Sequence, residues 1–155
     1  MSKYSLQKSP GPLIRRIHQI GMSLFADEFR DEDVTPLQFS CLWILKQQSN
    51  IDQITLAQAV ALDRTTCSQI IVKLEEKGLI TRDVDPKNRR AKLVNITEDG
   101  IRKVDELEAP MDRVQKKLIQ PLSTEERKVF LKCLRKLADS NNEFSRAPMR
   151  FLPLK

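Results

Sequence analysis

The sequence predicts a mainly α-helical domain with a small β-hairpin, in the order helix, helix, short helix, helix, hairpin, helix, helix. Three observations support this expectation. Apolar residues recur at helical spacing, capping side chains precede these stretches, and alternating apolar and polar residues follow a charged turn at Pro86. At 155 residues the chain has the size of a single domain, so we expect one folding unit over 1–155.

The composition favours a polyanionic partner and gives no sign of a cofactor. The formal net charge is +6, which suits a phosphate-bearing surface such as DNA. The three cysteines are odd in number and form no CxxC pair, which argues against disulfides and against a zinc site. The first residues lack an apolar leader, and no stretch is apolar for long enough to span a membrane. We expect a cytoplasmic protein with no metal or other cofactor.

Two helices are expected in the first third of the chain. The second begins after Thr35, whose hydroxyl can cap it with an answering Gln38, and runs to about Gln48. Its apolar residues surround the helix, so we expect it to be buried on several sides. The first spans 12–30 and carries an apolar stripe at spacings of four, three and four: Leu13, Ile17, Ile20 and Leu24.

Two shorter helices follow across a tight turn. Asp52 can cap a helix over 53–60, and Asp63 can cap another that ends near Lys77, just before Gly78. Two helices joined in this way have the outline of a helix-turn-helix motif.

A hairpin comes next. The segments 79–82 and 91–96 have strand character, and the second alternates apolar and polar residues. Between them lies the charged stretch 85–90, in which a proline and an asparagine favour a loop.

Two long helices complete the chain. Thr97 can cap the first, which should run to about Gln120 with a kink or interruption at Pro110. A capping box at Ser123 opens the last helix. This helix should reach about Asp139 and carry an apolar stripe inward: Val129, Phe130, Cys133, Leu134 and Leu137.

The fourth helix presents side chains of the types that read DNA. Once its apolar stripe is buried, the residues left facing outward lie toward its N-terminal half. Arg and Gln can pair bidentately with guanine and adenine, and Ser or Thr can bond to bases or backbone, so this face suits the major groove. A solvated helix face without function is the alternative. The candidate DNA-binding residues of this helix are Arg64, Thr65, Thr66, Ser68, Gln69 and Lys73.

The charged hairpin strengthens this interpretation. Arginine is attracted to the negative potential of a narrow minor groove, where it reads the shape of the DNA. Of the hairpin residues, Lys87, Arg89 and Arg90 are further candidate DNA contacts, and 36–100 is expected to be a winged helix-turn-helix lobe. The hairpin has three net positive charges, four cations minus one aspartate: Lys87, Arg89, Arg90 and Lys92 against Asp85.

Four linked motifs occur between residues 52 and 100. They are LAQAVALD at 56–63, LEEKGLITR at 74–82, DPKNRR at 85–90 and ITEDG at 96–100. In sequence and spacing the chain resembles the MarR family of transcriptional regulators, and the flanking helices match that family in order and length.

This resemblance implies a homodimer in which dimerisation helices over 12–30 and 101–155 from both chains interleave beside two winged lobes. It also implies a pseudo-palindromic, double-stranded DNA operator and a repressor that a small phenolic or aromatic acid releases. One position departs from the family pattern. Asn88 stands where an aspartate usually precedes the arginine pair, so it can offer a wing arginine only a neutral hydrogen bond.

The residues support a dimer without the resemblance as well. The amphipathic helices at both ends of the chain would leave their apolar stripes partly exposed in a compact monomer. The tail 144–155 adds further apolar residues, and we hypothesise that it packs on the partner subunit. A frayed terminus is the alternative.

An effector site has no sequence motif, so its residues are predicted from side-chain type alone. Cations on the first helix and aromatic rings on the second suit an aromatic carboxylate. The alternative is a structural role, which is common for a lone histidine or a core tryptophan. The candidates are Arg15, Arg16, His18, Phe39 and Trp43.

Two other functions stay open. One is a winged-helix protein-interaction module without DNA affinity. The other is a redox-responsive regulator, although Cys41, Cys67 and Cys133 all lie in apolar stripes and a reactive thiol should be exposed near cations. An enzyme is not expected, because the chain has one histidine and no phosphate-cradling glycine loop, GxSxG or HExxH motif.

Overall fold

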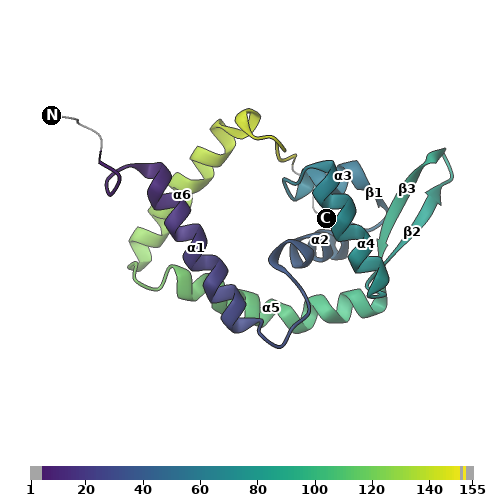
Figure 1. The fold of residues 1–155 in the computed structure, drawn as a ribbon, viewed down its shortest axis with the longest axis horizontal. Coiled ribbons are helices and arrows are strands. Elements are labelled where there is room, and N and C mark those ends of the chain that lie inside the picture. Colours follow the sequence, from purple (N-terminus) through teal and green to yellow (C-terminus); the bar gives the residue numbers. More distant parts are fainter. Residues whose placement is uncertain (1–4, 151, 153–155) are drawn as a thin grey trace.

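The computed structural model describes residues 5–150 and Leu152, except for the side chain of Arg90. The expected mainly helical fold with a small antiparallel sheet is confirmed (Figure 1). Its elements are α1 (Pro10–Glu28), α2 (Pro36–Gln47), β1 (Ile51–Asp52), α3 (Gln53–Ala59), α4 (Arg64–Glu76), β2 (Ile80–Asp85), β3 (Asn88–Ile96), α5 (Glu98–Leu118), α6 (Thr124–Ser140) and the 3-10 turn η1 (Asn142–Phe144).

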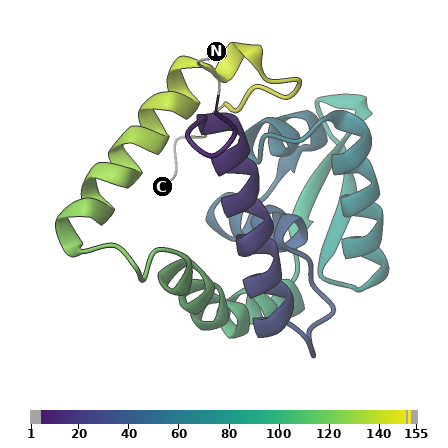
Figure 2. The same cartoon turned by 60° about the vertical axis from the view of Figure 1, so that its left-hand side comes forward.

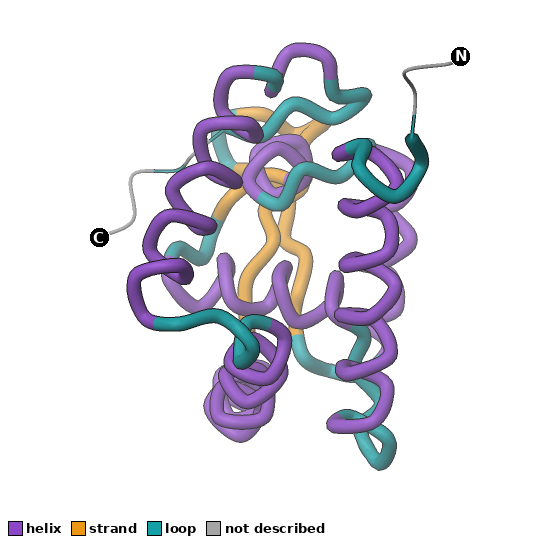
Figure 3. The backbone as a smooth tube through the Cα atoms, turned by 90° about the vertical axis from the view of Figure 1, so that its left-hand side faces the viewer, coloured by secondary structure: helices purple, strands orange, loops and turns teal. Residues whose placement is uncertain are grey.

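The elements form a lobe and a helical frame. The lobe contains α2, α3, α4 and the sheet, whereas α1 and α6 lie on the other side of the molecule and α5 joins the two sides (Figure 1). Figure 2 shows the frame from a second direction, and Figure 3 shows that the strands lie at the far side from α1 and α6. None of the helices in the described residues is long and apolar enough to cross a membrane.

One hydrophobic core joins the lobe to α5. Its fully buried side chains come from α2, α3, α4, both long strands and α5, and include Leu45, Leu56, Leu74, Val94 and Leu107. At the end of α1 the rings of Phe25 and the following Phe29 stack with their centroids 4.0 Å apart, and both belong to this core. Burial of α2 on several sides, which the sequence predicted, is confirmed.

Local capping explains where the helices begin. Thr35 and Gln38 form the predicted capping box, with the Gln38 backbone N–H donating to Thr35 Oγ1 at 3.2 Å and the Thr35 N–H donating to Gln38 Oε1 at 3.1 Å. Ser123 and Glu126 form the second box at the start of α6. Each cap satisfies N–H groups that a helix start leaves without partners.

The hairpin is longer than the sequence predicted. The stretch 85–90 was expected to be a loop, but β2 continues to Asp85 and β3 begins at Asn88, so the turn consists of Pro86 and Lys87. Asp85 Oδ1 accepts a hydrogen bond from the Lys87 N–H at 2.8 Å, which lets two residues reverse the chain. Pairing between the strands overrides the loop preference of this charged sequence.

The short strand β1 was missed. Ile51 pairs with Val94 and Asp52 with Leu93, which places β3 at the centre of a three-stranded sheet. Two residues are too few to show an alternating pattern. This strand is held by a pairing partner more than forty residues away.

Two expectations for the C-terminal helices need correction. Of the two outcomes expected at Pro110, an interruption is wrong, because Pro110 lies inside α5; a kink stays a prediction. The apolar stripe of α6 does not turn inward in the single chain: Val129, Leu134 and Leu137 are 60%, 39% and 53% exposed. The helical spacing was right, but within one chain this face has little to pack against.

The tail after α6 returns to the lobe of its own chain. Its anchor is the Arg150 N–H, which donates to the Gln58 carbonyl of α3 at 3.0 Å. Part of the tail thus contacts its own chain, and the hypothesis that the tail also packs on the partner stays a prediction. Phe144 is 88% exposed. Residues 151 and 153–155 lie outside the described part of the chain.

The start of α5 approaches the end of α4 so closely that only glycine fits at position 100. A Cβ on Gly100 would lie 2.2 Å from the Leu79 carbonyl oxygen, a backbone atom that cannot swing away. We expect Gly100→Ala to lower the free energy of unfolding by an amount near the upper end of the range of about 1–3 kcal/mol. Urea unfolding at a fixed protein concentration measures this change.

Gly11→Ala is the matched control, because a Cβ there would meet nothing within 4 Å. Its stability should equal that of the wild type or exceed it. Equal stabilities of the two variants would contradict the tight packing at Gly100.

Candidate nucleic-acid interface

The fourth helix is held by its cap, by a tight turn and by an apolar face. The Thr66 N–H donates to Asp63 Oδ1 at 2.9 Å, and this bond lowers the pKa of Asp63 below its ordinary value of 3.8. The turn before α4 closes with the Leu62 N–H on the Ala57 carbonyl at 2.8 Å, and Ala61 takes a φ of 53°. The buried face of α4 is made of Cys67, Ile70, Ile71 and Leu74.

The outward face of α4 lies where the sequence predicted it. Arg64, Thr65, Gln69 and Lys73 are exposed, and Ser68 is half-buried. Among the described residues, none forms an ion pair or side-chain hydrogen bond with Arg64, Gln69 or Lys73. These long polar side chains are free to meet a partner.

Thr66 differs from the other candidates on this helix. Its hydroxyl donates to Asp63 Oδ2 at 2.7 Å, and the residue is half-buried. The structure therefore gives Thr66 a capping role at the start of α4, in addition to any contact with DNA.

The wing carries its cations at the tip of the hairpin, which projects away from the lobe (Figure 1). Lys87 lies in the turn and Arg89 in the first part of β3, and both are exposed. The side chain of Arg90 lies outside the described residues. Asn88 pairs with Asp85 in the register of the two strands.

An ion pair that sequence reasoning missed ties the wing to α4. Arg82 of β2 donates from Nε to Glu75 Oε2 at 2.9 Å, and its Nη2 bonds to the same oxygen. This contact lowers the pKa of Glu75 and raises that of Arg82. The two residues lie only seven positions apart, on either side of the turn at Gly78. Their opposite charges were the signal in the sequence that could have predicted this ion pair.

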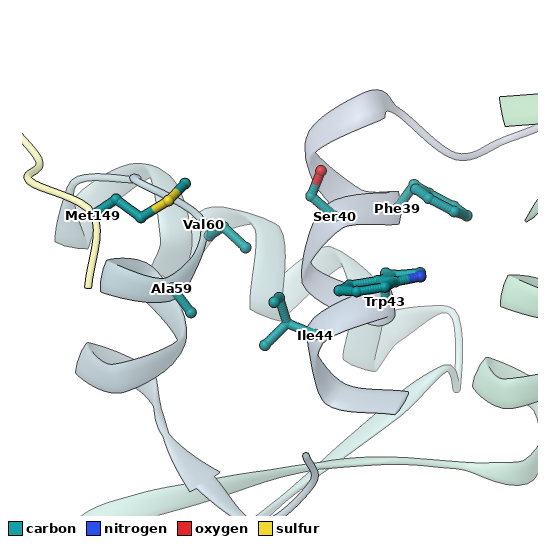
Figure 4. A pocket seen from close by; sticks show the side chains of 7 residues that line it. All are labelled: Phe39, Ser40, Trp43, Ile44, Ala59, Val60 and Met149. Carbon is teal, nitrogen blue, oxygen red and sulfur yellow. The ribbon is translucent and has the colours of Figure 1, made fainter. Parts of the chain in front are cut away.

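The predicted effector residues do not come together in the single chain. Phe39 and Trp43 line a cavity of about 320 Å³ between α2 and α3 (Figure 4). His18 lines a different one, of about 200 Å³, between α1 and α5. Arg15 and Arg16 are exposed on α1 and line neither cavity.

The cavity at Trp43 is mostly apolar. It opens to solvent and is bordered by α2, by the end of α3 and by Met149 of the tail (Figure 4). The lining residues are Phe39, Ser40, Trp43, Ile44, Ala59, Val60 and Met149.

The cysteines offer little support for redox chemistry in the lobe. Cys41 and Cys67 are buried. A hydrogen bond with Cys67, together with burial, raises the pKa of the Cys41 thiol, which therefore forms little thiolate and reacts slowly. The same bond lowers the pKa of Cys67, but this side chain is fully buried and out of reach of an oxidant. Cys133 is exposed in the single chain, contrary to its expected place in a buried stripe. Within the described residues, no cluster of His, Cys, Asp or Glu could hold a metal ion.

An exposed polar face on a helix that follows a tight turn, beside a basic hairpin, defines a winged helix-turn-helix protein. The MarR family profile matches residues 34–92, which contain α2 and most of the hairpin. The chain is 28% identical to the transcriptional repressor NicR of Pseudomonas putida over 138 aligned residues. The alignment covers 89% of this chain and 87% of NicR.

Two solved structures extend this likeness beyond the lobe. Bordetella bronchiseptica BpsR, whose DNA binding is regulated by 6-hydroxynicotinic acid, has a TM-score of 0.85 at 28% identity, over 89% of this chain and 99% of that one. The PcaV transcriptional regulator of Streptomyces coelicolor, solved with its natural ligand, has a TM-score of 0.80 at 30% identity, over 90% and 98%. The chain belongs to the MarR family.

Proposed function

We propose that this chain is a sequence-specific, double-stranded DNA-binding repressor that acts as a homodimer on a pseudo-palindromic operator and is released by a small aromatic acid. The observation that carries the proposal is the unpaired polar face of α4 beside the exposed cations of the wing. In this arrangement α4 enters the major groove and Arg89 reaches the adjacent minor groove. The Glu75–Arg82 ion pair links the two elements.

Selection of bound sequences from random duplex DNA tests this function. We expect Arg89→Ala to weaken binding to all sequences, with a salt dependence of the affinity that is shallower by about one per chain. Gln69→Ala should instead relax the preference at one base pair, at a cost of about 1–3 kcal/mol in discrimination. Titrations at two salt concentrations measure both effects.

The two variants control for each other, because each should leave the dimer intact and change a different property of DNA binding. An equal loss on all sequences for Gln69→Ala would contradict its role in base reading. Binding that does not change with salt would favour the protein-interaction module.

The exposed apolar faces of α1 and α6 support the dimer. Along α1, Leu13, Ile14 and Ile20 are 42%, 53% and 46% exposed, and α6 has no buried residue. Large apolar side chains exposed along two helices indicate a surface that a partner covers. Two lobes must lie about 34 Å apart to enter successive major grooves on one face of the DNA, so a symmetric pair accounts for a palindromic operator.

Leu134→Gln should dissociate the dimer, because it places an amide in the middle of the proposed interface. We expect a shift to monomers in sedimentation velocity and a joint loss of operator binding. Lys132→Gln lies on the opposite side of the same helix and should leave the dimer unchanged. A Leu134→Gln variant that stays dimeric at micromolar concentration would exclude α6 from the interface.

The cavity at Trp43 is the proposed effector site. It is lined by aromatic and aliphatic side chains, and its volume of about 320 Å³ suits a single substituted ring. The regulation of BpsR by 6-hydroxynicotinic acid suggests the chemical class, a small aromatic acid. Arg15 and Arg16 form no ion pair among the described residues and can supply a positive charge for the carboxylate once the second chain is present.

Trp43 is the only tryptophan of the chain, so its fluorescence reports directly on this cavity. Titration with 6-hydroxynicotinic acid and related acids should change its emission. Val60→Phe, which fills the cavity, should raise the acid concentration at the midpoint of this change at least tenfold. His18→Ala tests the other cavity. A response lost in His18→Ala but kept in Val60→Phe would move the effector to the space between α1 and α5.

A further inference from the structure

The tail after α6 is built as a fixed loop beside the DNA-reading helix. Asn142 binds both polar backbone atoms of Met149: its Oδ1 accepts from the Met149 N–H at 2.8 Å and its Nδ2 donates to the Met149 carbonyl at 3.0 Å. The Ala147 N–H donates to Ser145 Oγ at 3.1 Å. Together with the bond from the Arg150 N–H to the Gln58 carbonyl, these contacts hold the backbone on both sides of Arg146.

Arg146 of the tail lies beside the N-terminal end of α4. It lines one surface hollow together with Asp63 and Thr66, and a second one together with Arg64. The side chain of Arg146 is exposed, and no carboxylate among the described residues pairs with it. Two guanidinium groups without counterions therefore share this part of the surface.

The neighbouring charges leave Arg146 available for an external anion. Arg150 is paired with Glu143, at 2.7 Å and 3.3 Å between nitrogen and oxygen atoms. The one carboxylate in the hollow, Asp63, is occupied by the N–H and hydroxyl of Thr66. Arg146 has no such partner, and hydrogen bonds of the neighbouring Ser145, Ala147 and Met149 hold the loop around it.

We infer that the tail 145–150 is a third DNA-contacting element, in which Arg146 binds a backbone phosphate beside the major groove that α4 enters. The inference rests on the DNA-binding function proposed above. Helix-turn-helix proteins insert the N-terminal end of the second helix into the groove, so side chains around that end meet the flanking phosphates. The tail reaches the lobe on the side of α4 opposite the hairpin (Figure 1), so Arg146 and Arg89 contact opposite flanks of each half-site.

The test uses the full-length protein and the duplex that the wild type selects. Arg146→Gln should lower the affinity about three- to tenfold at low salt and make the salt dependence shallower by about one per bound chain. Because a phosphate contact carries no base information, the sequence preference should not change. Arg146→Lys should recover most of the affinity.

Lys8→Gln is the matched control, because it removes the same charge from an exposed residue at the N-terminal end of the chain. Its affinity should equal that of the wild type. Phosphate ethylation interference then locates the contact: Arg146→Gln and Arg89→Gln should each remove interference, on opposite flanks of the half-site.

Three other outcomes would overturn the inference, and they differ in what they mean for the proposed function. If Arg146→Gln behaves like Lys8→Gln while the wild type binds DNA, the inference is wrong and the proposed function stands. If the wild type shows no salt-sensitive binding to duplex DNA, the proposed function fails and the inference fails with it. A loss of affinity that coincides with loss of the dimer in sedimentation would assign the tail to assembly and overturn the inference.

Discussion

The position of α4 depends on one junction, where the end of α4, the start of β2 and the start of α5 meet. The Thr97 hydroxyl donates to the Gly78 carbonyl at 2.8 Å, and the Thr97 N–H donates to the Leu79 carbonyl at 3.1 Å. Gly78 takes a φ of 70°, which ends α4 and turns the chain into the sheet. Thr97 Oγ1 also accepts from the Gly100 N–H at 3.0 Å and so caps α5. A single threonine thus joins the winged helix-turn-helix lobe to the long helix of the frame.

Helix starts were predictable because the interactions that define them are local. A capping side chain and the N–H that it binds lie two or three residues apart, so Thr35, Asp52, Asp63 and Ser123 are visible as caps in the sequence. The strand β1, the length of the hairpin and the return of the tail depend on partners far away along the chain. The spacing of the α6 stripe predicted the helix, but it could not distinguish a face that packs within the chain from one that faces a second chain.

The same distinction holds for the candidate site. The outward face of α4 follows from helical periodicity once its buried stripe is known, so Arg64, Gln69 and Lys73 were predictable. The second role of Thr66 depends on the geometry of the cap, and the Glu75–Arg82 pair depends on the path of the chain through Gly78. The effector residues were chosen by side-chain type alone. Type does not determine position, and the structure distributes them between two cavities and the open surface of α1.

The tail connects the cavity to the surface of the lobe. Met149 lines the cavity beside Trp43, while Asn142 holds the backbone of the same methionine, and Arg146 lies within that closed loop. A ligand changes DNA affinity only through contacts that differ between the bound and free states. An occupant that displaces Met149 alters the loop that carries Arg146, whereas one that leaves Met149 in place must act through the spacing of the two lobes. In either case the coupling energy has to pass through α2, α3 or the tail, because these are the elements that line the cavity.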